Sequence, residues 1–423
     1  MIILLLISFF LLLILGTPIY VVLGASSILV LAVFGMAPLE IGVQRMMAGV
    51  DKFTLVAIPF FILAANIMAS GGIARRLVNF ARLLVGHFRG GLGFATVLAS
   101  MFFGAVSGSS PATVASIGKP LYPSLIKEKY PVNLSSGLII TSGSLGIIIP
   151  PSVTMIIYGA VTGSSVGELF IGGIGAGVFF GLVLMIYVYF MARKNDIKKL
   201  NKPSGKAVLK GLLDSIWGLG IPIIILGGIY GGIFTPTEAA GVSVIYALIV
   251  TMFIYREVTY KELYEIIADS VKVTVQVMII IGSASIFSWV ITSSGFADEV
   301  VDMVFGLTTE TLGILLLINL FFLIGGMFLD GSSLILILAP ILVPIGLQAG
   351  IDPIFLGVLI TVNCAIGMFT PPFGLNIFVG SSVTDLSVAT VSRSTIPFVF
   401  ITLIILVLLI LFPQIILWLP STI

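Results

Sequence analysis

The chain has 423 residues, of which 59% are hydrophobic and 9% are charged, and its net charge is +2. A soluble globular protein carries roughly 25% charged residues, so a water-soluble fold of this composition would expose large apolar patches. One histidine and one cysteine, Cys364, argue against a metal site built from these residues. The sequence also has no basic domain of the kind that binds nucleic acid. We therefore expect an all-α polytopic membrane protein.

The apolar stretches set the expected membrane helices. Met1 to Phe34 has no charged segment before it, so it is interpreted as a first membrane helix and not as a cleaved signal peptide. A membrane helix needs about 20 mostly apolar residues. Stretches of this kind lie near 3–34, 53–70, 132–162, 169–192, 215–234, 237–255, 273–292, 353–380 and 395–419. Tryptophan is typical of membrane interfaces, and this position is expected for Trp217, Trp289 and Trp418.

Two further apolar regions, 91–126 and 311–348, are each interrupted by a small polar cluster. The clusters are Ser107-Gly108-Ser109-Ser110-Pro111 and Asp330-Gly331-Ser332-Ser333. Each half is too short to span a bilayer comfortably, and a break at bilayer depth survives only where protein or a water-filled cavity covers it. Both regions are interpreted as re-entrant helical hairpins. The alternative is a kink in an ordinary spanning helix, where glycine and serine serve packing.

An internal repeat favours the hairpins over the kinks. Three motifs of the first half recur in the second half at displacements of 223, 221 and 218 positions. They are Gly72 with Gly108 (recurring as Gly295 with Gly331), Gly146 to Pro151 (Gly367 to Pro372) and Thr17-Pro18 (Thr235-Pro236). The repeat predicts a first unit at 1–192, a basic linker at 193–214 and a second unit at 215–423.

The charges indicate that the two units have opposite orientations. The segment after Gly72 is basic, whereas its counterpart after Gly295 is acidic. The charged residues are Arg75, Arg76, Arg82 and Arg89 in the first segment and Asp298, Glu299, Asp302 and Glu310 in the second. Because positive charge stays cytoplasmic, the hairpin at 91–126 is expected to face the cytoplasm and the hairpin at 311–348 the periplasm, as in inverted repeats. Both charged segments are interpreted as interfacial amphipathic helices.

The same rule orients the rest of the chain. The linker 193–214 is rich in lysine and arginine, so it is expected to be cytoplasmic. From this anchor we expect a cytoplasmic N-terminus and a periplasmic C-terminus. Of the 20 lysines and arginines, only Arg45 and Lys52 would then be periplasmic.

The two polar clusters are the candidate ion sites. A helix broken within the membrane exposes carbonyl oxygens at one half and amide groups at the other, and a proline frees a carbonyl oxygen on the preceding turn. We expect one sodium site to be formed by Ser107, Ser109, Ser110, Gly146, Ile149 and Pro150, and a second by Gly331, Ser332, Ser333, Gly367, Thr370 and Pro371. Helix N-termini suit a carboxylate, so an anionic substrate is expected between the sites, near Ser110, Ser152, Ser333 and Asn376.

Other polar residues leave alternatives open. Asp330 is either a sodium ligand or proton-coupling carboxylate, or the N-cap of the half-helix that follows it. Glu238 is interpreted as part of the cap of a helix that begins at Pro236. His87 is interpreted as an interfacial packing residue, and neither a nucleophile–base pair nor a phosphate-binding loop is evident. We therefore assign no catalytic residue, and an intramembrane enzyme is disfavoured.

Four stretches of this sequence resemble the large membrane subunit of tripartite ATP-independent periplasmic (TRAP) transporters, and the resemblance covers essentially the whole chain. They are Phe102-Phe103-Gly104 with Ser107 to Ser110, Ile149 to Ser152, Gly231 to Ala240 and Phe369 to Gly374. The resemblance implies an elevator-type, sodium-coupled importer of acidic solutes such as dicarboxylates, sugar acids and sialic acid, with no cofactor besides sodium ions. It places the protein in a bacterial inner membrane.

The resemblance also implies two partner proteins, a small four-helix membrane subunit and a periplasmic substrate-binding protein. It maps the sodium-site carbonyls of the family onto the hairpin tips and the Pro-Pro breaks named above. A stand-alone anion channel or exporter is the alternative function, since sequence alone does not separate it from a coupled importer.

Overall fold

The computed structural model describes residues 1–422. In this range the regular secondary structure is helical and contains no strand, which confirms the predicted all-α class. Seven helices are long and apolar enough to cross a membrane, or eight if the bent segment at 132–162 counts as one span.

The elements in chain order are α1 (Ile2–Ile14), α2 (Ile19–Phe34), α3 (Leu39–Val50), η1 (Phe53–Val56), α4 (Ala57–Ser70), α5 (Ile73–Val85), α6 (Gly91–Ser107), α7 (Ser110–Lys127), α8 (Val132–Gly143), α9 (Leu145–Ile148), α10 (Val153–Thr162), α11 (Val166–Lys194), α12 (Gly205–Tyr230), α13 (Pro236–Leu248), η2 (Ile249–Ile254), α14 (Tyr260–Ser293), α15 (Phe296–Leu307), α16 (Thr311–Gly326), α17 (Gly331–Gln348), α18 (Pro353–Gly367), α19 (Leu375–Thr384), α20 (Val388–Leu411), α21 (Gln414–Leu417) and η3 (Pro420–Thr422).

The N-terminal apolar run forms a hairpin and not one helix. Helices α1 and α2 pack against each other, and the turn between them contains Gly16 at a φ of +73° and Pro18 as the N-cap of α2. A left-handed glycine followed by a proline ends one helix and starts the next. The expected single span over 3–34 is therefore wrong.

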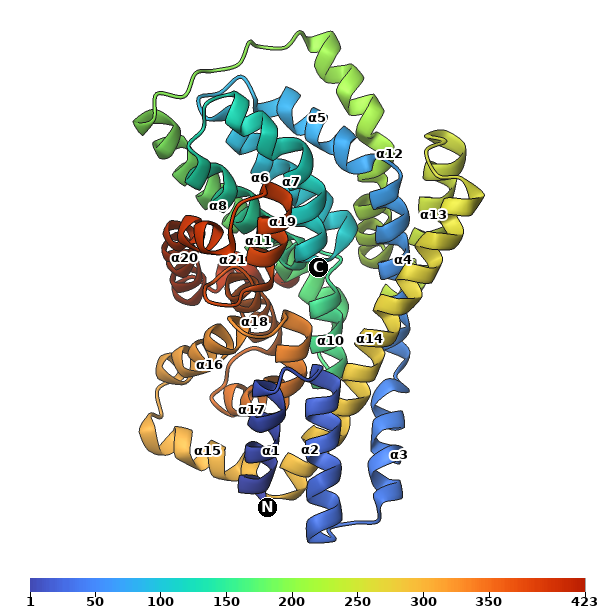
Figure 1. Cartoon of the computed structure of the whole chain (residues 1–423), viewed down its shortest axis with the longest axis vertical. Coiled ribbons are helices and arrows are strands. Elements are labelled where there is room, and N and C mark those ends of the chain that lie inside the picture. The colour runs from blue at the N-terminus through green and yellow to red at the C-terminus, as the bar shows by residue number, and fades with distance from the viewer. Residues whose placement is uncertain (423) are drawn as a thin grey trace.

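The N-terminus and the segment after the basic linker lie toward different ends of the molecule. Figure 1 shows the N-terminus at the lower end of the molecule, whereas α5 and the start of α12, which follows the basic linker, lie toward the upper end. The N-terminus and the start of α12 thus lie toward different ends of the molecule, and a cytoplasmic N-terminus stays a prediction.

Helices α3, α4 and α14 lie along one side of the molecule. Helix α14 has 34 residues, packs against α2, α3 and α4, and crosses most of the length of the molecule in Figure 1. A capping box of Thr259 and Glu262 begins it. A second capping box, of Thr235 and Glu238, begins α13 and confirms the role expected for Glu238. Helix α3 has no counterpart among the spans predicted from sequence.

The regions 91–126 and 311–348 form the two predicted helical hairpins. Helices α6 and α7 contact each other and meet at Gly108 and Ser109. Helices α16 and α17 contact each other and meet at 327–330. The helices of each pair lie against one another, so neither pair is one kinked rod.

The charged segments after Gly72 and Gly295 form helices α5 and α15. Both glycines have a left-handed φ and act as N-caps. Helix α5 lies toward the top of Figure 1 and α15 toward the bottom, which supports the inverted arrangement of the two units. Helix α5 is amphipathic and packs against α6 and α12, whereas Val304 is the sole residue classed as buried along α15.

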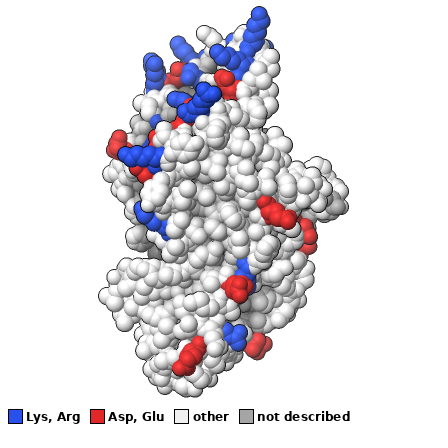
Figure 2. All heavy atoms as spheres, turned by 90° about the vertical axis from the view of Figure 1, so that its right-hand side faces the viewer, with Lys and Arg blue, Asp and Glu red and all other residues white. Residues whose placement is uncertain are grey.

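Basic side chains gather at one end of the molecule. Figure 2 shows lysines and arginines concentrated at the top, the end built by α5, the end of α11 and the start of α12. The lower half of this face carries few basic side chains and several acidic ones. This separation of charge is typical of a membrane protein whose two ends lie in different compartments.

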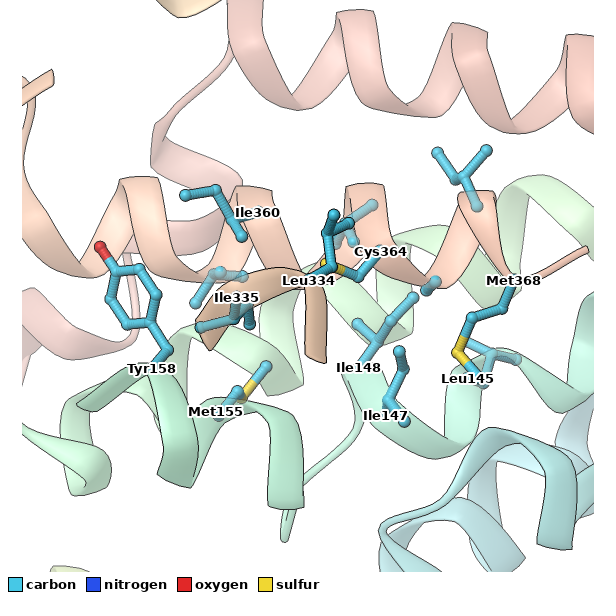
Figure 3. Close-up of a cluster of buried hydrophobic side chains, with 14 of the residues drawn as sticks. Leu145, Ile147, Ile148, Met155, Tyr158, Leu334, Ile335, Ile360, Cys364 and Met368 are labelled. Carbon is cyan, nitrogen blue, oxygen red and sulfur yellow. The ribbon is translucent and has the colours of Figure 1, made fainter. Parts of the chain in front are cut away.

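A dense apolar core joins the first unit to the second. Figure 3 shows side chains of α9 and α10 facing side chains of α17 and α18. They include Ile147, Ile148, Met155, Leu334, Ile335, Ile360 and Cys364, all almost fully buried. Because close-packed interiors resist local movement, this core holds the break near Pro150 in register with the start of α17.

Candidate functional site

Both hairpin tips line one cavity of about 330 Å³. The tip of α6 and α7 contributes Gly108, Ser109 and Ser110, and the tip of α16 and α17 contributes Asp330, Gly331 and Ser332. Helix α14 supplies the facing wall with Val273, Gln276, Val277 and Ile280. The structure therefore brings the two clusters singled out from the sequence to the same place, although their glycines, Gly108 and Gly331, are 223 positions apart.

The first tip depends on a glycine. Gly108 has a φ of +60°, a conformation that glycine adopts without strain and other residues rarely adopt. A Cβ atom at this position would lie 2.7 Å from the carbonyl oxygen of Pro151. The tip thus rests directly on the first Pro-Pro break, and the contact leaves no room for a side chain.

Hydroxyl groups of the first tip bond to the tip itself. The Ser109 carbonyl accepts hydrogen bonds from the Thr113 hydroxyl at 2.8 Å and from the Thr113 N–H at 3.1 Å. The Ser107 and Thr113 hydroxyls are 2.9 Å apart. Two of the expected sodium ligands, Ser107 and Ser109, are therefore joined through Thr113, a residue that the sequence analysis did not select.

An aspartate caps the second tip. The Asp330 carboxylate accepts hydrogen bonds from the N–H groups of Ser332 at 3.0 Å and Ser333 at 3.3 Å, and from the Ser333 hydroxyl. The N-cap role considered for Asp330 is therefore present. Asp330 also lines the cavity, so the residue that caps the start of α17 also borders the space between the tips.

The two Pro-Pro motifs break their helices as expected. The peptide bonds Pro150-Pro151 and Pro371-Pro372 are both cis. The first break separates α9 from α10 and bends the segment by 41°, and the second separates α18 from α19. Both expected breaks are confirmed, and each interrupts a helix that packs against a hairpin.

Paired glycines bring each hairpin arm against the helix before its break. A Cβ atom at Gly104 would lie 3.0 Å from the Cα of Gly146, and one at Gly326 would lie 3.0 Å from the Cα of Gly367. Gly146 also reaches the first tip, since its Cβ would lie 2.6 Å from the Ser109 carbonyl oxygen. Small residues permit such close approach of backbones within membranes.

The second break differs in its hydrogen bonding. The Gly367 carbonyl accepts from the Thr370 N–H at 3.0 Å, and the Thr370 hydroxyl donates to the Ile366 carbonyl at 2.7 Å. The second tip contacts α18 through Gly331, whose Cβ would lie 3.2 Å from the Cβ of Cys364. Gly367 and Thr370 thus lie at the end of α18 and in the break that follows it, and α18 packs beside the second tip.

The four residues expected near the substrate are all buried, and one of them, Ser110, lines the cavity. The Asn376 side-chain amide donates to the Ser110 hydroxyl at 2.7 Å, while the Asn376 Oδ1 atom has no hydrogen-bond partner within residues 1–422. Ser152 caps α10 by accepting from the Met155 N–H. The Ser333 hydroxyl donates a hydrogen bond to the Asp330 carboxylate.

The sequence analysis missed two polar residues of the cavity, Gln276 and Thr154. Gln276 lies within the apolar stretch 273–292, and an isolated glutamine in such a stretch is a detectable signal because a polar side chain in a membrane helix needs a partner. Thr154 follows Ser152 by two residues and has no comparable signal in the sequence.

The paired hairpins, the twin Pro-Pro breaks and the all-helical frame agree with a match to a family of membrane proteins. The family described as "Tripartite ATP-independent periplasmic transporter, DctM component" matches residues 6–415. The chain belongs to this family. The DctM family is a transporter permease family, so the chain is a multi-pass membrane protein of a transport system.

Curated relatives of this DctM-family chain cover nearly its full length. It is 41% identical to the C4-dicarboxylate TRAP transporter large permease protein of Pseudomonas aeruginosa, covering 94% of this chain and 93% of the relative. It is 40% identical to the ectoine/5-hydroxyectoine large permease protein of Ruegeria pomeroyi, covering 96% of each. It is 38% identical to the sialic acid large permease protein of Vibrio cholerae, covering 89% and 88%.

A solved structure shares the fold of this DctM-family chain. The YdaH transporter of Alcanivorax borkumensis superimposes with a TM-score of 0.62 at 16% sequence identity. The superposition covers 88% of this chain and 87% of the other. At this identity the likeness describes the fold alone.

Proposed function

We propose that the chain is the large permease subunit of a sodium-coupled, binding-protein-dependent importer of an organic acid. The observation that carries the proposal is the charge content of the cavity between the hairpin tips. Helices α7 and α17 both begin at this cavity, yet none of its lining residues is basic and one, Asp330, is acidic.

Two helix N-termini favour a carboxylate, because each presents free N–H groups and a partial positive charge. Together the two N-termini supply at most about one elementary positive charge, and the negative charge of the Asp330 carboxylate opposes it. A bound dicarboxylate would therefore leave net negative charge in a poorly hydrated space, which is costly. Cations that enter with the substrate remove this cost, so the charge content of the cavity favours coupled transport over a channel.

Sodium is the proposed cation because the available ligands are neutral oxygens. The first proposed site joins Ser107, Ser109 and Ser110 to Gly146, Ile149 and Pro150, where the tip touches the first break. The second proposed site joins Gly331, Ser332 and Ser333 to Gly367, Thr370 and Pro371 on the adjacent α18 segment. Carbonyl and hydroxyl oxygens at helix breaks are the ligands that coupling sodium ions use in secondary transporters.

The proposed orientation places the basic end in the cytoplasm, following the positive-inside rule. The N-terminus then lies on the periplasmic side, opposite to the position expected from sequence, and a periplasmic C-terminus stays a prediction. A bacterial inner membrane is the proposed location.

The tripartite nature of the family supports two partners, a small membrane subunit and a periplasmic binding protein. An elevator movement of the hairpin-bearing part against the α3–α4–α14 side is the proposed transport step.

Uptake into proteoliposomes tests this proposal. The full chain is reconstituted with its small subunit and binding protein, and uptake of succinate, N-acetylneuraminate, 2,3-diketogulonate and ectoine is measured. We expect one organic acid to accumulate only with an inward sodium gradient and only with the binding protein. Uptake by this chain alone, without dependence on sodium, would instead establish the channel or exporter.

A further inference from the structure

A second polar cavity lies beside the cavity between the hairpin tips. It has a volume of about 210 Å³ and is lined by Arg45, Lys52, Ser285, Ser288 and Trp289, among others. Arg45 and Lys52 come from α3 and the segment that follows it, and the other three come from α14. No residue of this set belongs to the sites proposed above.

The two cavities share three helical walls. Helix α14 lines the first cavity up to Ile280 and the second from Ile281 onward. Helix α17 lines the first with its initial residues and the second with Leu336 and Pro340, one to two turns further along. Helix α10 likewise lines the first with Thr154 and the second with Val161. The second cavity therefore lies between the same three helices, further from the hairpin tips.

The charge of the second cavity is opposite to that of the first. Two basic residues line the second cavity, and none of its lining residues is acidic. The ion pairs found within residues 1–422 include neither Arg45 nor Lys52. The nearest acid in sequence, Asp51, is not part of the lining. Charges of one sign in a recess raise the local concentration of ligands of the opposite sign.

Both basic groups are held in position by neutral partners. The Arg45 guanidinium lies 5.4 Å from the centre of the Trp289 ring, a cation–π contact that leaves its N–H groups available. The Lys52 ammonium donates to the Ala160 carbonyl at 2.7 Å, which leaves two of its three N–H donors. A carboxylate entering the cavity would thus meet two oriented donors that form no ion pair within residues 1–422.

We propose that this cavity is an entrance site that binds a carboxylate of the organic anion through Arg45 and Lys52 before the anion reaches the hairpin tips. The proposal rests on the function proposed above. It explains how an anion approaches a cavity that carries Asp330 and no basic side chain: the anion is first concentrated one to two helical turns away, where the charge is favourable. Trp289, expected as an interface anchor, acts here as the support of Arg45.

The test is a double variant, Arg45→Gln with Lys52→Gln, in the full chain with its small subunit. Two measurements are made: equilibrium binding of succinate, N-acetylneuraminate and 2,3-diketogulonate without the binding protein, and initial uptake rates with it. Each is carried out at about 20 and about 200 mM ionic strength, which spans the range over which exposed charges become screened. The matched controls are Lys261→Gln, a lysine on α14 at the other end of the molecule, and the charge-conserving pair Arg45→Lys with Lys52→Arg.

We expect the double variant to weaken binding and raise the KM by at least about tenfold, since it removes both charged donors that the carboxylate would meet. The maximal rate should change less than twofold, and the salt dependence of the KM should be lost. The Lys261→Gln variant should match the wild type, and the charge-conserving pair should lie close to it.

Three outcomes overturn the inference. Unchanged binding and an unchanged KM in the double variant, in a wild type that transports with sodium, would exclude an anion site at this cavity. A defect that occurs only when the binding protein is present would assign Arg45 and Lys52 to docking of that protein. A wild type without sodium-driven uptake would remove the proposed function itself, and the inference with it.

Discussion

The tips of the two hairpins lie at the same cavity, but different interactions form the turn at each tip. The tip of α6 and α7 is closed by a left-handed glycine, Gly108, which rests on the Pro151 carbonyl. The tip of α16 and α17 is closed by Asp330, which caps α17, and Gly331 does not have a positive φ. One tip thus depends on backbone shape and the other on a side-chain charge.

The supporting contacts of the hairpins differ in the same way. The arm of the first hairpin meets α8 through the Ser100 and Ser142 hydroxyls, which are 3.1 Å apart. The arm of the second meets α18 through Asn319 and Asn363, whose side chains are 2.9 Å apart and buried. Repeats with a common backbone plan can therefore carry unequal polar groups, and this inequality gives each hairpin its own sensitivity to mutation.

The largest difference is expected from alanine at the two tip glycines. Gly108→Ala forces a non-glycine residue into a left-handed φ and against a carbonyl oxygen, at a cost of about 1–3 kcal/mol. We expect sodium-driven uptake to fall at least tenfold, with membrane insertion retained. Gly331→Ala adds a methyl group whose neighbours lie 3.2 to 3.7 Å away, and we expect uptake within about threefold of the wild type. Equal losses in the two variants would show that the tips are not distinguished by backbone shape.

A smaller effect is expected at the polar pairs of the arms. Asn363→Leu leaves the buried Asn319 side-chain oxygen without its donor, and an unsatisfied buried group costs about 1–3 kcal/mol. Ser142→Ala removes a weaker hydroxyl contact and should cost about 0.5–1.5 kcal/mol. The midpoint of thermal unfolding in detergent measures both. A larger loss for Ser142→Ala would reverse the ranking of the two hairpins.

At Asp330 two substitutions separate the cap from the charge. Asp330→Ala removes the cap and should cost about 1 kcal/mol of stability, whereas Asp330→Asn keeps a capping oxygen and should cost a few tenths. We expect Asp330→Asn to raise the sodium concentration for half-maximal uptake several-fold, because it removes the carboxylate from the cavity lining. Unchanged sodium dependence in Asp330→Asn would leave the residue as a cap alone.

A small effect on stability, without loss of a charge, is expected from Ser107→Ala. The Ser107 hydroxyl makes one close contact, with Thr113, and two longer ones with Ser109, at 3.3 Å to its carbonyl and at 3.4 Å from its N–H. Its loss should lower the free energy of unfolding by about 0.5–1 kcal/mol. Thermal unfolding tests this, with Ser124→Ala on the exposed part of α7 as the control. A loss as large as that of Asn363→Leu would mean that the first tip depends on its hydroxyls as well as on Gly108.

Local sequence patterns were sufficient to predict the hairpins and the helix breaks. Gly108 and Gly331 interrupt otherwise apolar stretches, and Pro150 and Pro371 remove backbone donors, so each break is encoded within a few residues. The α1–α2 hairpin was missed because Gly16 and Thr17 form its turn within an apolar run of nearly uniform character. The signal, a glycine two residues before Pro18, is weak where no polar cluster accompanies it.

The arrangement of the site could be predicted only in part. The sequence places Ser110 and Asn376 in separate repeats, 266 positions apart, and nothing local indicates that their side chains meet. It also gives no sign that Thr113 holds the Ser109 carbonyl, since a threonine one turn into a helix has many possible partners. The contribution of α14 depends on packing between distant segments, and so Gln276 was overlooked.

Helix α14 has a consequence for how the molecule sits in its membrane. At 1.5 Å per residue its 34 residues extend for about 50 Å, whereas the hydrocarbon core is about 30 Å thick. The helix must therefore lean strongly or project its charged first turn, Lys261 and Glu262, into water. In the proposed elevator movement, a body that slides along a leaning helix would travel sideways as well as across the bilayer, so lipid neighbours on both sides would have to rearrange with every transport cycle.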